Sequence, residues 1–117
     1  MARLLIVDDA AFMRRMLADM VAGEHEVCGE AANGMEAIAK YKELKPDIVT
    51  MDISMPEMQG IDAMREILAY DREAKVLICS AIGHRQKVLE AMKSGARDFL
   101  VKPFQKEQVL DAISRLL

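Results

Sequence analysis

Charged and hydroxyl-bearing side chains stand at the points where four apolar runs of the chain end. Asp8 and Asp9 follow LLIV, Asp52 follows IVTM, Ser80 follows VLIC and Lys102 follows FLV. Two carboxylates about 4 Å apart repel each other by roughly 4 kcal/mol at an effective dielectric of 20, so a cluster of three needs positive charge. The lysine supplies one charge, and a set of oxygen ligands favours Mg²⁺ for the rest. A carboxylate can also be the nucleophile in phosphoryl transfer, with hydroxyl and ammonium groups binding the phosphoryl oxygens.

Each of these residues also has an ordinary explanation when it is considered alone. Asp8 or Asp9 could cap the following helix, and Asp52 could be a turn residue before a proline-containing loop. Lys102 could be a solvated loop lysine, and Ser80 alone is uninformative. Because aspartate is depleted in strands, and because the pattern repeats at the ends of different runs, a shared site is the better interpretation.

Five short apolar runs predict the strands that position these residues. They are Leu4–Val7, Glu26–Gly29, Asp47–Met51, Val76–Cys79 and Phe99–Val101. Continuously apolar runs are typical of strands that are covered on both faces. Strand and helix alternate five times, which predicts an α/β three-layer sandwich with a parallel sheet. Ligands of such a sheet bind outside the carboxyl ends of its strands.

Segments with helical spacing separate the runs. The first predicted apolar face consists of Met13, Met16, Leu17, Met20 and Val21, and the last of Val109, Ile113, Leu116 and Leu117. Asn33 is placed to cap the second helix, with Glu36 three residues later. Gly95 is placed to end the fourth helix in a left-handed conformation.

Composition limits the function classes. The 117 residues are 52% hydrophobic and 30% charged, which suits one domain. A net charge of -3 and 4% aromatic residues disfavour a nucleic-acid partner. No run approaches the roughly 18 apolar residues of a spanning helix, and none resembles a signal peptide, which predicts a cytoplasmic protein without a membrane partner. Cys28 and Cys79 lie in apolar runs and are predicted to be buried free thiols. His25 and His84 are interpreted as surface side chains rather than metal ligands.

Four motifs together resemble one known family. They are LLIVDDAAFMR, DIVTMDISMPEMQGID, VLICSAIG and GARDFLVKPF, and they span essentially the whole chain. They are similar to the receiver domain of two-component response regulators, particularly the stand-alone chemotaxis response regulators of CheY type. The resemblance implies a flavodoxin-like (βα)5 fold with strand order 2-1-3-4-5. It also implies that residues 1–117 are a single receiver domain with no output domain.

The resemblance assigns roles to the strand-end residues. Asp52 matches the phospho-accepting aspartate, Ser80 the switch hydroxyl and Lys102 the lysine that pairs with the phosphoryl group. Asp9 and Asp52 would ligate Mg²⁺ together with the backbone carbonyl of Ser54. Asp8 would act mainly through metal-bound water. The bond between Lys102 and Pro103 is expected to be cis.

Partners and activity follow from the same resemblance. A histidine kinase would donate the phosphoryl group, and the chain would be a phospho-acceptor with magnesium-dependent self-phosphorylation and self-dephosphorylation rather than an enzyme. The phosphorylated protein is expected to be a monomer and would bind the flagellar motor switch. A dedicated phosphatase is a further candidate partner. Phe99 matches the aromatic switch position. The expected partner face consists of His84, Arg85, Val88, Met92, Phe99 and Val101, although a merely solvated helix would show similar spacing.

Several residues depart from the family pattern. Phe99 stands where many relatives have tyrosine, so coupling would depend on packing alone. Ser80 is the smaller of the two usual hydroxyl residues. Ser54 and Ile82 occupy positions that tune the dephosphorylation rate in relatives, and the apolar Ile82 cannot orient a water molecule by hydrogen bonding. The connection over residues 21–25 is about one residue shorter than in close relatives.

Three other functions compete with this interpretation. A phosphorelay intermediate would keep the chemistry and pass the phosphoryl group to another histidine. An aspartate-nucleophile phosphatase usually carries a second acid two residues after its nucleophile, where this chain has Ser54. A flavin-binding module needs a Gly/Ser/Thr-rich phosphate loop after the first strand, where this chain has Asp-Asp-Ala-Ala-Phe.

Overall fold

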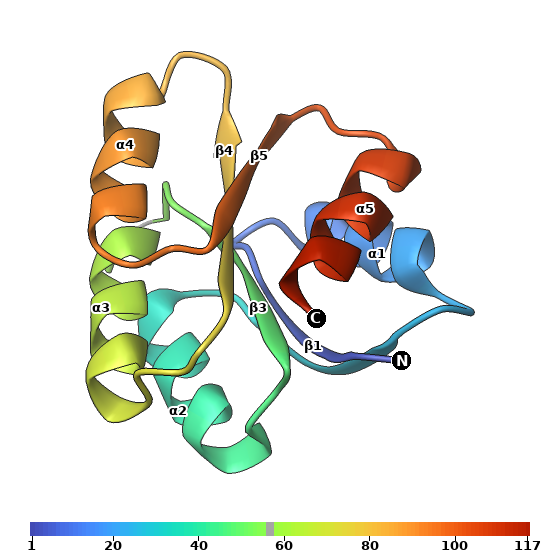
Figure 1. The fold of residues 1–117 in the computed structure, drawn as a ribbon, viewed down its shortest axis with the longest axis horizontal. Helices are drawn as coiled ribbons and strands as arrows, with labels where there is room; N and C mark the ends of the chain where they lie inside the picture. Colours follow the sequence, from blue (N-terminus) through green and yellow to red (C-terminus); the bar gives the residue numbers. More distant parts are fainter. Residues whose placement is uncertain (56–57) are drawn as a thin grey trace.

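A computed structural model, which describes residues 1–55 and 58–117, shows five parallel strands in one sheet (Figure 1). The strands are β1 (Arg3–Val7), β2 (Glu26–Ala31), β3 (Ile48–Asp52), β4 (Val76–Ala81) and β5 (Asp98–Lys102). They are ordered β2-β1-β3-β4-β5, which confirms the predicted flavodoxin-like order. Most boundaries differ by one or two residues from those predicted. Strands β2 to β5 all end later than predicted, because the ladder continues past the apolar runs.

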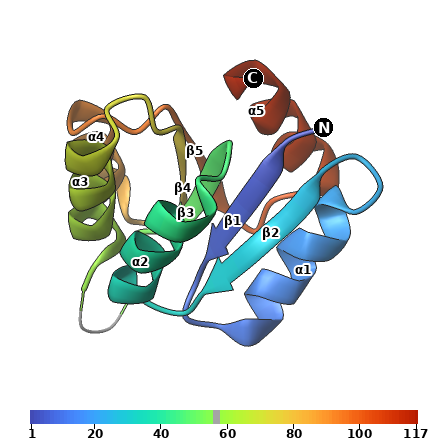
Figure 2. The ribbon, with the colours of Figure 1, turned by 90° about the horizontal axis from the view of Figure 1, so that it is seen from below.

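Helices cover both faces of the sheet. They are α1 (Ala11–Val21), α2 (Gly34–Leu44), α3 (Gly60–Tyr70), α4 (Arg85–Lys93) and α5 (Lys106–Leu116). The views in Figures 1 and 2 show α1 and α5 on one face and α2, α3 and α4 on the other. Each face has its own apolar core, one built around Leu4, Leu77 and Ile113 and the other around Leu5, Met51 and Ile67. The arrangement is the predicted three-layer sandwich.

Register brings the strand-end residues to one edge of the sheet. Val7 lies beside Met51, and Asp52 lies beside Cys79. On the far side of β4, Ala81 lies beside Lys102. The loops that follow β1, β3, β4 and β5 therefore leave the sheet at the same end, as parallel strands require.

The predicted helix ends have a local chemical basis. The Asn33 side chain accepts a hydrogen bond from the Glu36 backbone N–H at 2.9 Å, which confirms the cap of α2. The Glu36 carboxylate accepts from Ala32 rather than from the cap residue itself, a small variation on the reciprocal cap. Gly95 follows α4 with φ of +119°, a conformation that a residue with a Cβ rarely adopts.

Several side chains differ from the packing that their sequence pattern predicts. Met16 is exposed because α1 buries only a narrow stripe through Leu17 and Val21. Leu117 lies beyond the end of α5 and is exposed. Cys28 is only half-buried because it lies on the edge strand β2, whereas Cys79 on β4 is buried as predicted. His25 is half-buried rather than on the surface, and its Nδ1 accepts a hydrogen bond from the Ala2 backbone.

The longest helices have 11 residues. Over the described ranges, none is long and apolar enough to cross a membrane.

Candidate functional site

Three carboxylates converge at the carboxyl edge of the sheet. Asp8 and Asp9 follow β1, and Asp52 ends β3; an oxygen from each lies within 4.8 Å of an oxygen from the others. Asp8 and Asp52 are only 3% and 5% exposed, whereas Asp9 is exposed. Buried carboxylates are stable only when they are paired or bind a cation. The structure thus places the predicted acidic residues together.

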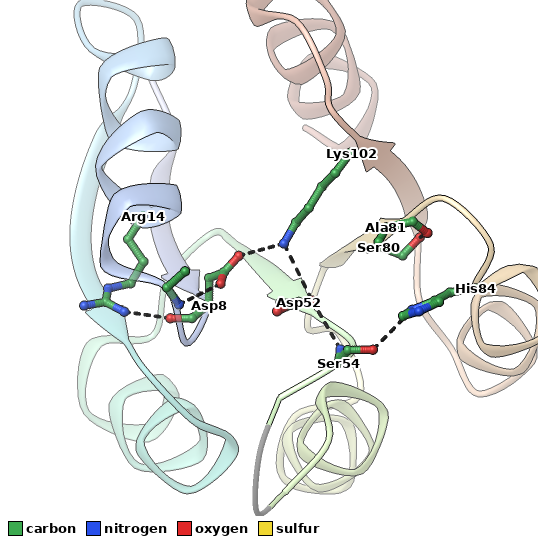
Figure 3. Close-up of polar contacts among 9 residues, drawn as sticks. Asp8, Arg14, Asp52, Ser54, Ser80, Ala81, His84 and Lys102 are labelled. Atoms are coloured by element: carbon green, nitrogen blue, oxygen red, sulfur yellow. Dashed lines mark hydrogen bonds and ion pairs between the residues drawn. The ribbon is translucent and has the colours of Figure 1, made fainter.

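Lys102 reaches into this cluster from the end of β5 (Figure 3). Its Nζ lies 3.0 Å from Asp8 Oδ2 and 3.8 Å from Asp52 Oδ1. The peptide bond between Lys102 and Pro103 is cis, as expected. The ammonium group is therefore hydrogen-bonded to Asp8 while it remains close to Asp52, the residue beside which the family resemblance places a phosphoryl group.

The charges in the cluster alter one another's protonation. Burial raises the pKa of Asp52, an effect that the Lys102 ammonium opposes and the Asp8 carboxylate reinforces. Burial alone would lower the pKa of Lys102, but its hydrogen bond to Asp8 and the charges of Asp52 and Asp8 together raise it. The lysine is thus held in its charged form. One ammonium group beside three carboxylates leaves the cluster short of positive charge.

The loop after β1 is fixed by contacts that the sequence interpretation missed. The Arg14 guanidinium donates to the backbone carbonyl of Asp8 at 2.7 Å and to the Glu30 carboxylate at 2.9 Å. The Ala10 backbone N–H donates to Asp8 Oδ1 at 2.9 Å, so the side chain is held as well. The position of Arg14 one turn into α1 was the only available signal, and helix arginines are too common for it to be specific.

Gly60 is a second residue that sequence reasoning missed. A Cβ at this position would lie 2.0 Å from the backbone oxygen of Asp52 and 2.8 Å from the Cα of Ile53. The first turn of α3 therefore packs directly on the backbone that carries the acidic residue. Only glycine permits this approach, and a glycine at a helix start gave an ambiguous signal in the sequence.

The loop after β3 connects the acidic cluster to α4. The Ser54 backbone N–H donates to Asp52 Oδ1 at 3.2 Å. The Ser54 hydroxyl is hydrogen-bonded to His84 Nδ1, also at 3.2 Å (Figure 3). His84 is half-buried and precedes α4, so the interpretation of its side chain as a simple surface group is wrong.

Ser80 lies on β4 beside the cluster and is 1% exposed. Its hydroxyl donates to the Ala81 carbonyl at 3.4 Å, a long bond to its own neighbour. Phe99, on β5, is 43% exposed. The two residues that match the switch positions are thus seen with the hydroxyl bonded locally and the aromatic ring outward.

A groove of about 440 Å³ lies between α4 and β5 and begins at Ser80. All six residues of the expected partner face line it, together with Ile82 and Leu89, which the sequence interpretation did not include. Ile82, Leu89, Phe99 and Val101 are 76%, 46%, 43% and 40% exposed. Exposed apolar side chains gathered in one hollow are typical of binding sites.

The donor set fits a hard divalent cation. Asp8, Asp9 and Asp52 supply carboxylate oxygens, which Mg²⁺ prefers, and two of the three are buried. A cation would also supply the positive charge that Lys102 alone does not. The cluster can accordingly hold a cation beside a carboxylate nucleophile, with an ammonium group on the other side.

Comparisons with known proteins agree with this geometry. Residues 4–114 match the family model described as the response regulator receiver domain. The chain is 60% identical to the chemotaxis protein CheY of Thermotoga maritima over 115 residues, covering 97% of this chain and 96% of that protein. It is 54% identical to the chemotaxis protein CheY of Bacillus subtilis, covering 98% and 97%. Its fold matches a chain of the CheX-CheY-BeF3-Mg+2 complex from Borrelia burgdorferi with a TM-score of 0.92 and 38% identity, over 97% of this chain and 87% of that chain.

Proposed function

The chain belongs to the response regulator receiver domain family, and we propose that it is a chemotaxis response regulator whose Asp52 accepts a phosphoryl group from a histidine kinase. Its similarity to CheY proteins makes it a CheY-like response regulator of two-component signalling. The observation that carries the finer proposal is the convergence of Asp8, Asp9 and Asp52 at the carboxyl edge of the sheet, with Lys102 beside Asp8 and Asp52.

Asp52 is the proposed nucleophile. A carboxylate oxygen of Asp52 attacks the phosphorus of a phosphohistidine, the P–N bond breaks, and the bonding electron pair stays on the imidazole that leaves. The product is an acyl phosphate on Asp52. Asp52 is the last residue of β3, so the sheet holds its backbone, and it is 5% exposed. A carboxylate oxygen of Asp52 lies within 4.8 Å of oxygens of Asp8 and Asp9.

Lys102 and Ser80 would stabilise the phosphoryl oxygens. The ammonium group is already 3.8 Å from Asp52 Oδ1 and is held there by Asp8. The Ser80 hydroxyl donates one long hydrogen bond, of 3.4 Å, to the Ala81 carbonyl. It would give up this bond and donate to a phosphoryl oxygen instead. Charge-assisted hydrogen bonds are stronger than this neutral one, so the hydroxyl would turn toward the phosphoryl group.

Magnesium fits the proposed reaction. Asp9, Asp52 and the backbone carbonyl of Ser54 would hold Mg²⁺, with Asp8 acting through metal-bound water. When bound, the ion neutralises charge on the attacking and transferring oxygens. The chain's own residues orient the nucleophile, and the same site would later admit the water molecule that hydrolyses the acyl phosphate.

The groove between α4 and β5 is the proposed output surface. Ser80 lines it, so movement of this hydroxyl toward Asp52 would change its floor. Phe99 lines it as well and could turn into the space that the hydroxyl leaves. Its apolar walls and the basic Arg85 suit an amphipathic segment with acidic residues. We assign this partner to the flagellar motor switch protein, because the relatives are chemotaxis proteins.

The remaining parts of the proposal concern organisation. Residues 1–117 would act as one receiver domain, as a monomer, in the cytoplasm. A phosphorelay intermediate that passes the phosphoryl group to another histidine protein is the alternative. A CheX-CheY-BeF3-Mg+2 complex from Borrelia burgdorferi shows a CheY bound to a second protein. A second protein partner, such as a dedicated phosphatase, is therefore included in the proposal.

Phosphoryl transfer is the direct test. The protein is incubated with Mg²⁺ and a phosphorylated histidine kinase, and the alkali-labile, hydroxylamine-sensitive phosphate on it is measured. We expect one phosphoryl group per chain, lost in Asp52→Asn and after chelation of the metal. Equal labelling of Asp52→Asn would overturn the assignment of the acceptor.

A further inference from the structure

The loop between β4 and α4 forms part of the groove wall and follows the strand that carries Ser80. It consists of Ile82, Gly83 and His84, which lie between the strand that carries Ser80 and the first turn of α4. Ile82 is 76% exposed, and Gly83 has φ of +98° with open space where a Cβ would stand. Neither residue anchors the loop by packing.

One polar contact ties this loop to the rest of the protein. Ser54 Oγ and His84 Nδ1 are hydrogen-bonded at 3.2 Å across 30 residues of sequence. Within residues 1–55 and 58–117, it is the sole hydrogen bond that links residues 82–84 to a segment other than α4. The His84 side chain makes no capping hydrogen bond to α4, and its Nδ1 is hydrogen-bonded to Ser54 instead.

Both ends of this contact lead to functional groups. On one side, the Ser54 backbone N–H donates to Asp52 Oδ1 at 3.2 Å. On the other, the His84 carbonyl accepts from the Val88 N–H at 3.0 Å, the first backbone hydrogen bond of α4. His84 and Val88 both line the groove. A short path of hydrogen bonds therefore runs from the acceptor carboxylate to the groove wall (Figure 3).

We propose that His84 is a positioning residue that couples Asp52 to α4 through the Ser54 hydroxyl. The inference rests on the proposed function and adds a specific route for the signal. The contact is present while Ser80 is bonded to Ala81 and Phe99 is outward, and we expect it to favour this arrangement. A phosphoryl group on Asp52 would weaken the hydrogen bond that the Ser54 N–H now donates to its carboxylate. Residue 54 would then move, and its hydrogen bond to His84 would shift the start of α4.

The site offers a clean set of variants. Ser54→Ala removes the hydroxyl but keeps the backbone carbonyl and N–H, and residue 54 does not line the groove. Ser54→Thr keeps a hydroxyl and serves as the conservative rescue. His84→Leu removes the same hydrogen bond from the other end. The double variant tests whether the two changes act through one contact.

The first measurement is the hydrogen-exchange rate of the Val88 amide in the protein without metal or phosphoryl analogue. We expect Ser54→Ala and His84→Leu each to speed this exchange about two- to tenfold, the loss that one neutral hydrogen bond produces. The double variant should exchange no faster than either single one, and Ser54→Thr should match the unsubstituted protein. Unchanged exchange in Ser54→Ala, or effects that simply multiply in the double variant, would overturn the inference.

The second measurement adds Mg²⁺ and beryllofluoride, the phosphoryl analogue. The change that beryllofluoride causes in Val88 exchange should be smaller in Ser54→Ala than in the unsubstituted protein, again by about two- to tenfold. An identical change in both proteins would show that coupling bypasses the contact, and it would overturn the inference. If the unsubstituted protein does not bind beryllofluoride, the proposed function fails, while the first measurement still decides whether His84 holds α4.

Discussion

The acidic cluster and the groove both depart from the usual burial of side chains, the cluster by burying charged groups and the groove by exposing apolar ones. In the cluster, Asp8 and Asp52 are almost fully buried although they carry charge. In the groove, Ile82 and Phe99 are exposed although they are apolar. The two regions share Ser80, which lies on the strand between them.

The difference shows what each region needs from outside the chain. Buried charge costs free energy unless a counter-charge is present, and Lys102 supplies only one. Exposed apolar surface costs free energy until another surface covers it. The cluster is therefore suited to a small ion and a phosphoryl group, and the groove to a polypeptide. Changes to Asp52 or Lys102 should alter chemistry, and a change to the groove residue Phe99 should alter binding alone.

The largest effect is expected from Asp52→Asn. Because an amide oxygen is a poor nucleophile, phosphoryl incorporation from a small-molecule donor such as acetyl phosphate should fall by about 100-fold or more. Phosphate-affinity electrophoresis measures the product. The groove variant Phe99→Ala is the matched control and should retain full incorporation. Loss of incorporation in both variants would remove the distinction between the two regions.

Replacement of Lys102 by methionine should destabilise the fold, because its ammonium group pairs with the buried carboxylates. In Lys102→Met, Asp8 and Asp52 lose the ammonium group that lies 3.0 and 3.8 Å away. The free energy of unfolding without Mg²⁺ should fall by about 2 kcal/mol, since both carboxylates stay buried without their partner. Urea unfolding measures this change.

A lysine outside the cluster provides the control for that experiment. Lys106 begins α5 and is exposed, so Lys106→Met should change the free energy of unfolding by less than about 0.5 kcal/mol. Added Mg²⁺ should restore more stability to Lys102→Met than to the unsubstituted protein. Equal stability of the two lysine variants would show that Lys102 does not compensate the buried charge.

The groove should show the converse behaviour. Phe99→Ala should weaken binding of the motor-switch peptide by about tenfold, because the ring that shapes the groove is removed, with stability almost unchanged. Isothermal titration in the presence of beryllofluoride measures the affinity. Met16→Ala, which truncates an exposed apolar side chain on α1, is the control and should bind normally. Equal losses in both variants would place the partner elsewhere.

The smallest effect concerns pH. Burial raises the pKa of Asp52, so the unfolded chain ionises this carboxyl at a lower pH than the folded protein does. Above the raised pKa, ionised Asp52 therefore lowers stability, and the penalty disappears as pH falls through that value. Asp52→Asn should be more stable than the unsubstituted protein at neutral pH without Mg²⁺, by on the order of 1 kcal/mol. Thermal unfolding over acid to neutral pH checks this, and a gap that widened toward acid pH would contradict it.

The sequence predicted the parts of the molecule that depend on chain order. Strand periodicity and polar residues at strand ends were enough to place Asp8, Asp52 and Lys102 at one edge, because parallel strands share that edge. The strand order itself came from the family resemblance. The residues that the resemblance assigned to the partner face line one groove.

The sequence could not predict the contacts that depend on loop path and side-chain rotamer. Ser54 and His84 are 30 residues apart and meet only because two loops leave adjacent strands. Arg14 reaches a backbone carbonyl, which no pattern of side-chain types reveals. Helical spacing likewise overstated the buried face of α1, since the width of its contact depends on how the helix sits on the sheet.

The central claim is that occupancy of the buried acidic cluster controls the exposed groove. The direct test is a titration with the N-terminal peptide of the flagellar switch protein in Mg²⁺, with and without beryllofluoride. We expect beryllofluoride to tighten peptide binding several-fold and Asp52→Asn to abolish this gain. If beryllofluoride bound at Asp52 but the peptide affinity stayed the same, the claimed link between the two regions would be wrong for this partner, and the phosphorelay function would be favoured.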